Sequence, residues 1–103
     1  MSDSLVAFVF VQTQFREDKT ARLLARLPEV EELHRIAGAD CYVLRVRVSN
    51  MEQLGRLVRD KIERIRSVRS TRTTLVLKTL KDKQARQLKK SASGAAKTLE
   101  QTG

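Results

Sequence analysis

Apolar and polar residues alternate along residues 41–48, as in a strand whose two faces meet different surroundings. One face is entirely apolar, whereas the other carries two arginines between smaller residues. The apolar face consists of Tyr42, Leu44, Val46 and Val48, and the mixed face of Cys41, Val43, Arg45 and Arg47. This pattern predicts a strand with one face against a hydrophobic core.

The spacing of apolar residues changes to three and four after Asn50, which predicts a helix over residues 51–65. Asn50 can accept a hydrogen bond from the first turn as an N-cap. Alternation returns over residues 71–78, where Thr71 and Thr73 share one face with two leucines. The second half of the chain therefore reads as strand, helix and strand.

The first half begins with a strand over residues 4–12 that is apolar on both faces, which is typical of a central strand covered on both sides. A helix is predicted over residues 16–27, with its leucines facing inward. We predict a core of Val6, Phe8, Phe10, Leu23, Leu24, Leu27, Leu44, Val46, Val48, Leu54, Leu57, Val58, Ile62 and Val76.

Residues 28–37 fit two interpretations. Pro28 followed by glutamates is typical of a helix start, whereas the alternation of apolar and charged residues also fits an exposed edge strand. The topology favours the strand, because it completes the order β-α-β-β-α-β of a ferredoxin-like α+β fold. We therefore predict a four-stranded antiparallel sheet with two helices on one face.

Lysine and arginine outnumber aspartate and glutamate by 21 to 12, which gives a formal net charge of +9. Such a charge attracts nucleic acids, anionic lipids and acidic proteins without specificity. We expect a domain over residues 1–80 and a basic, disordered tail over residues 81–103, which either solubilises the protein or contacts nucleic acid. The single cysteine and the lack of a long apolar run predict a cytoplasmic protein outside the membrane.

Candidates for chemistry are few. His34 is the only histidine and has no cysteine cluster beside it, so we expect no metal site and no other cofactor. The sequence contains no evident nucleophile–base pair of the kind that an enzyme would need. A small enzyme of the dimeric α/β-barrel type is nevertheless an alternative. A basic ferredoxin-like nucleic-acid-binding protein is a second alternative, but four aromatic residues give little capacity for base stacking.

Five motifs in order resemble the effector-binding domain of the Lrp/AsnC (feast/famine) transcription regulators, known as the RAM domain. They are VAFVFV, LPEVEELHRIAGAD, CYVLRVRV, MEQLGRLV and RSTRTTLVLK, and the resemblance covers about residues 4–80. The first strand starts close to Met1, so we expect a stand-alone module without the family's helix-turn-helix domain and without sequence-specific DNA binding of its own. The resemblance implies a homodimer, a higher oligomer, and co-assembly with relatives that carry a helix-turn-helix.

The resemblance also implies functional residues. An amino-acid effector would bind between subunits at Gly38, Ala39, Asp40 and Cys41, with Thr71 and Thr73 contributed by a neighbouring chain. The sheet face with Val43, Arg45 and Arg47 would form the dimer interface. The sequence departs from the family at Asp40–Cys41, where many members have an aromatic residue followed by Asp, or two acidic residues.

Each of these residues also has a purely structural interpretation. Asp40 can serve as a turn former, and Cys41 as a small strand residue. The two threonines can simply fill a strand face. The arginines would be solvated in a monomer.

Overall fold

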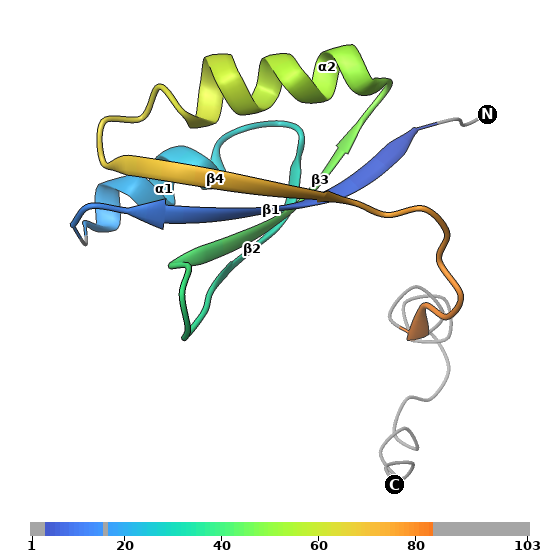
Figure 1. The fold of residues 1–103 in the computed structure, drawn as a ribbon, viewed down its shortest axis with the longest axis horizontal. Helices are drawn as coiled ribbons and strands as arrows, with labels where there is room; N and C mark the ends of the chain where they lie inside the picture. Colours follow the sequence, from blue (N-terminus) through green and yellow to red (C-terminus); the bar gives the residue numbers. More distant parts are fainter. Residues whose placement is uncertain (1–3, 16, 84–103) are drawn as a thin grey trace, which may run out of the picture.

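The computed structural model describes residues 4–15 and 17–83, which form one sheet and two helical segments (Figure 1). The elements are β1 (Leu5–Thr13), α1 (Asp18–Ala25), β2 (Val30–Arg35), β3 (Tyr42–Val48), α2 (Met51–Arg56), η1 (Leu57–Ile62) and β4 (Val68–Leu75). This order confirms the predicted ferredoxin-like α+β fold. No helix in the described residues is long and apolar enough to cross a membrane.

The sheet has four strands in the order β2-β3-β1-β4, and every neighbouring pair is antiparallel. β1 is central, as its two apolar faces predicted, and both helices lie against the same face of the sheet (Figure 1). Residues 30–35 form the edge strand β2, so pairing with β3 prevails over the local helix propensity of this segment.

The core lies between this sheet face and the helices, and its β1 residues differ from our prediction. The fully buried β1 side chains are Ala7, Val9 and Val11, rather than Val6, Phe8 and Phe10. The reason is the register: Ala7 and Val9 pair with Val46 and Leu44, so they share the apolar face of β3. The other eight fully buried or nearly buried hydrophobic residues are Leu24, Tyr42, Leu44, Val46, Val48, Leu54, Leu57 and Ile62.

The second helical segment also departs from a regular helix. Asn50 caps it as predicted, accepting a hydrogen bond from the Gln53 N–H at 2.8 Å. After Arg56 the helix widens, and the Glu63 N–H donates to the Val58 carbonyl five residues back at 2.8 Å. The wide turn lets both Leu57 and Ile62 reach the core, although a regular helix would turn them apart by about 140°.

The last strand is shifted from the predicted range of residues 71–78. β4 begins at Val68 and ends at Leu75, and the Leu77 side chain is 91% exposed. Residues 84–103 lie outside the described part of the chain. The proposed tail, residues 81–103, therefore stays a prediction for most of its length.

Candidate functional site

The connection between β2 and β3 is a tight loop, which we call the Gly38 loop and define as residues 36–41. The Ile36 N–H donates to the Cys41 carbonyl at 3.0 Å and closes the hairpin. Gly38 has a φ of 135°, a conformation that residues with a Cβ atom rarely adopt. Glycine is therefore required by the backbone here, and the loop places Ala39, Asp40 and Cys41 at one end of the sheet.

Backbone and amide hydrogen bonds hold the Gly38 loop against β1. Gln12 donates through Nε2 to the Ala39 carbonyl at 2.7 Å, and the Cys41 N–H donates to the Val11 carbonyl at 2.9 Å. The hydroxyl of Ser70 on β4 donates to Gln12 Oε1 at 3.2 Å. The loop is thus connected through Gln12 to the far edge of the sheet.

An ion pair makes a second connection to β4. Arg72 Nη2 donates to Asp40 Oδ2 at 2.7 Å, and the Asp40 side chain is only 16% exposed. The Arg72 guanidinium also lies over the Phe10 ring, 4.2 Å from its centre, in a cation–π contact. Asp40 is therefore a bound carboxylate rather than a free turn residue, and Arg72 joins the loop to the sheet.

The sheet face opposite the helices, which we call the open sheet face, carries an apolar strip along β1. Val6, Phe8 and Phe10 form the strip, and by register they pair with Arg47, Arg45 and Val43 of β3. The three residues predicted for a dimer interface therefore do share this face. All three side chains of the strip are half-buried within the single chain.

Arg45 and Arg47 have a carboxylate partner within their own chain. Glu31 of β2 accepts from Arg45 Nη1 and from Arg47 Nε, each at 2.6 Å. The hydrogen bond from Arg47 to Glu31 raises the pKa of Arg47 further above its ordinary value. A charged partner from a second subunit is therefore not needed to keep these arginines paired.

Thr71 and Thr73 lie on the other side of β4 from Arg72. They pair with Val11 and Val9, whose side chains face the helices. The Thr71 hydroxyl donates to Glu63 Oε2 at 2.6 Å. Within one chain the structure thus brings Gly38, Ala39, Asp40 and Cys41 together but leaves both threonines on the opposite sheet face.

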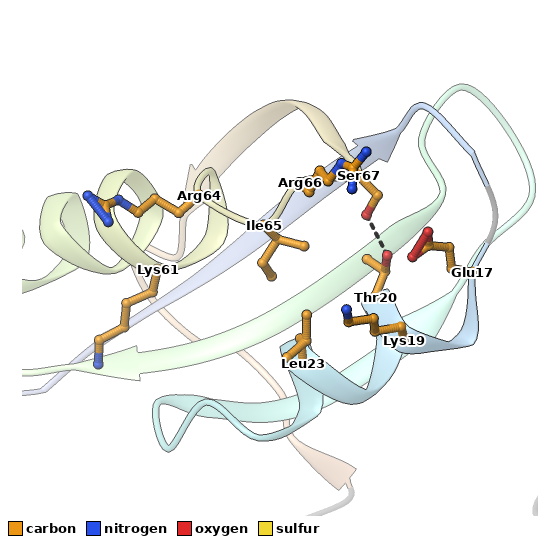
Figure 2. A pocket seen from close by; sticks show the side chains of 9 residues that line it. All are labelled: Glu17, Lys19, Thr20, Leu23, Lys61, Arg64, Ile65, Arg66 and Ser67. Atoms are coloured by element: carbon orange, nitrogen blue, oxygen red, sulfur yellow. Dashed lines mark hydrogen bonds between the residues drawn. The ribbon is translucent and has the colours of Figure 1, made fainter.

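A shallow groove of about 380 Å³ lies between α1 and the segment that enters β4, and we call it the α1–β4 groove. Its nine lining residues are Glu17, Lys19, Thr20, Leu23, Lys61, Arg64, Ile65, Arg66 and Ser67 (Figure 2). The Thr20 and Ser67 hydroxyls share a hydrogen bond across it. The sequence alone gave no sign of this groove, because its two walls are far apart in the chain.

Within residues 4–15 and 17–83, no three His, Cys, Asp or Glu side chains are placed to hold a metal ion. His34 Nε2 lies 3.1 Å from Glu32 Oε1 on the exposed edge strand. Cys41 is half-buried, and its sulfur accepts from the Thr13 hydroxyl at 3.4 Å.

Residues 6–86 match the family model of the Lrp/AsnC ligand binding domain. Among curated proteins, the HTH-type transcriptional regulator LrpB of Bacillus subtilis (strain 168) is 34% identical over 64 residues. These residues are 61% of this chain and 43% of LrpB, so the chain spans less than half the length of that relative.

Two solved structures are also similar. AsnC of E. coli has a TM-score of 0.72 at 23% identity, a likeness that concerns the fold, and the alignment covers 78% of this chain and 54% of AsnC. A feast or famine regulatory protein of M. tuberculosis, solved in complex with L-methionine, has a TM-score of 0.68 at 33% identity, again over 78% of this chain and 54% of that one.

Proposed function

Because the chain belongs to the Lrp/AsnC ligand-binding domain family, we propose that it is an amino-acid-responsive assembly module in transcription regulation and not an enzyme. The regulators LrpB and AsnC are relatives of this domain by sequence or fold. The M. tuberculosis relative holds L-methionine, which supports an amino acid as the effector class. The module would form homodimers and higher oligomers and would act by co-assembly with relatives that carry a helix-turn-helix domain.

The proposal rests on one observation: the Arg72 side chain contacts both the Gly38 loop and the open sheet face. It binds Asp40 at 2.7 Å and stacks on Phe10 at 4.2 Å. An effector ammonium at Asp40 would compete with Arg72 for the carboxylate, since both are cations seeking the same acceptor. Release of Arg72 would remove its guanidinium from the Phe10 ring and so change the surface that the open sheet face presents to a second subunit. Effector binding and subunit pairing would therefore be coupled.

The loop offers the chemistry that an amino acid requires. Its ammonium needs an anionic acceptor, which Asp40 provides, and its carboxylate needs N–H donors, which the backbone around Gly38 can offer. Thr71 and Thr73 would add hydroxyl contacts from a neighbouring subunit. Cys41 would line the site as a small residue beside Asp40.

Assembly would use the open sheet face. Its apolar strip of Val6, Phe8 and Phe10 is half-buried in one chain, and Val43 lies beside it. A second copy would cover these side chains and remove apolar surface from water. Because Glu31 already hydrogen-bonds both Arg45 and Arg47, the three side chains together would bring a net charge of only about +1 into such an interface.

A second candidate function, single-strand nucleic-acid binding, gains one observation from the structure. Phe8 and Phe10 lie on the open sheet face, where bases could stack. However, the arginines Arg45, Arg47 and Arg72 on this face are all paired with carboxylates of the same chain. Phosphate binding needs cations that are available, so the amino-acid-responsive module is the better supported function.

The test is a thermal-shift screen of the purified chain against the standard amino acids at millimolar concentration. A ligand at about 100 times its Kd should add about 2.7 kcal/mol of stability, which is several degrees in Tm for a domain of this size. Asp40→Asn should abolish the shift, whereas Asp60→Asn, at an exposed carboxylate beside Arg59, should retain it. A flat panel with the native chain would contradict the amino-acid effector.

A further inference from the structure

The α1–β4 groove combines an apolar floor with cationic walls. Leu23 of α1 and Ile65 point into it, and both are half-buried (Figure 2). Four basic side chains and one acidic side chain line it. The volume of about 380 Å³ lies within the range of sites that hold small molecules rather than macromolecules.

Three of the four basic side chains that line this groove take part in no ion pair within the described residues. Lys61 is bound to Glu29 at 2.9 Å. In the described residues, Lys19, Arg64 and Arg66 take part in no ion pair. Figure 2 shows Lys19, Arg66 and the acidic Glu17 at the same end as Thr20 and Ser67, whereas Arg64 and Lys61 extend toward the other end. Two cations that take part in no ion pair, and the single carboxylate of Glu17, therefore lie around the hydroxyl pair.

The hydroxyl pair adds a hydrogen-bond donor. Thr20 and Ser67 are 1% and 2% exposed, and they are the buried polar residues of the described chain. When two hydroxyls share one hydrogen bond, the accepting oxygen keeps its own proton for another acceptor. Within the described residues neither hydroxyl makes a further hydrogen bond. A buried donor that remains available is costly unless an acceptor reaches it.

We propose that the α1–β4 groove binds a small organic anion. Its apolar body rests on Leu23 and Ile65, and its head group, a carboxylate or a phosphate, is held by Lys19 and Arg66 and accepts from the Thr20–Ser67 pair. This site does not use Asp40 or any other residue of the Gly38 loop. It is therefore independent of the amino-acid site proposed above.

The experiment is a titration of the full chain followed by saturation-transfer NMR, which detects weak binding through the protons of the ligand. The probes are phenyl phosphate and benzoate, with benzamide as the neutral analogue. Inorganic phosphate, the head group alone, has no C–H protons and is measured by its competition with the aromatic anion. At least one aromatic anion should bind saturably with its ring protons receiving saturation, and the tighter of the two identifies the head group. Benzamide and inorganic phosphate should bind at least about fivefold more weakly.

Variants locate the site. Lys19→Gln and Arg66→Gln should each weaken the anion at least about fivefold, because both side chains are exposed and can be changed without disturbing the core. Arg69→Gln removes the same charge from β4 outside the groove and should leave affinity within about twofold, as should Asp40→Asn. Equal binding of benzamide, no saturable binding of either anion, or equal losses in Arg66→Gln and Arg69→Gln would overturn the proposal.

Discussion

At the scale of single residues, two glycines differ in what their backbones require. Gly38 has a φ of 135°, whereas Gly55 lies within the helix α2 with open space around the position of an added Cβ. We expect Gly38→Ala to destabilise the domain by about 1–3 kcal/mol through backbone strain. Gly55→Ala should stabilise it by about 0.5–1 kcal/mol, because it lowers the entropy of the unfolded chain and favours the helix.

Chemical denaturation of both variants beside the native chain measures this difference. The two mutations add the same methyl group, so each serves as the control for the other. A Gly38→Ala variant as stable as Gly55→Ala would mean that the loop can adopt another conformation without cost. The effector screen on Gly38→Ala would then show whether the loop's shape matters for binding.

At this scale, contacts between residues that are far apart in the sequence could not be predicted. The glycine turn and Asp40 could be identified locally, because turn chemistry depends on adjacent residues. The partner Arg72 is 32 residues away from Asp40 and could not. Glu31 posed the same problem for Arg45 and Arg47, because in sequence it was one of three nearby glutamates. The β2–β3 register pairs Arg45 with Glu32, whereas the glutamate that binds the arginines is Glu31, at the irregularity between Val30 and Glu32.

At the scale of elements, an ion pair joins the start of β2 to η1. Glu29 Oε2 accepts from Lys61 Nζ at 2.9 Å, and the Glu29 side chain is 12% exposed. Burial alone would raise the pKa of Glu29, but the hydrogen bond and charge of Lys61, with the hydrogen bond from its own backbone, lower the pKa below the ordinary value of 4.5. The folded chain therefore binds fewer protons than the unfolded chain as this carboxyl titrates.

We expect this pair to contribute stability above about pH 5 and to lose it as the pH falls through the lowered pKa of Glu29. Glu29→Gln should cost up to about 1 kcal/mol at neutral pH and should remove this part of the acid-induced loss. Melting curves at neutral pH and at successively lower pH values measure the difference. Glu52→Gln, which changes a carboxylate 3.9 Å from Arg56, is the control and should retain the acid-induced loss.

The elements themselves were largely predictable, and the errors have physical causes. In β3, the arginines on one side of the strand are enough to identify the other side as its core face. β1 is apolar on both sides, so the sequence could not say which side meets the helices, and the prediction chose the wrong side. The larger Phe8 and Phe10 lie on the open sheet face, and the smaller Ala7, Val9 and Val11 pack beneath the helices.

At the scale of the whole molecule, the open sheet face decides the proposed assembly. Val43 lies opposite Phe10 on this face and is half-buried, so a glutamate there is tolerated by the core but not by a covering subunit. We expect Val43→Glu to reduce the assembly to monomers while circular dichroism shows a folded domain. Sedimentation velocity measures the change in mass.

The outcomes for Val43→Glu separate two failures of this hypothesis. A variant that stays fully assembled would show that subunits meet elsewhere on the surface. A variant that unfolds would show that Val43 supports the fold itself. Thr74→Glu, on the same face at the edge strand β4, tests whether any added charge has the effect, and it should perturb assembly less than Val43→Glu.

The position of β1 in the middle of the sheet also affects how the protein is made. β1 leaves the ribosome before both of its neighbours, and Phe10 is synthesised well before Arg72, its partner on β4. At about 5–20 residues per second, the roughly 60 residues between them take about 3–12 s to synthesise. β3 is made partway through that time, so at first this strand, which is apolar on both sides, has neither neighbour, and afterwards it still lacks β4. The nascent chain, rather than the finished domain, is therefore the form most exposed to aggregation, and β1 is the segment that a holding chaperone would cover.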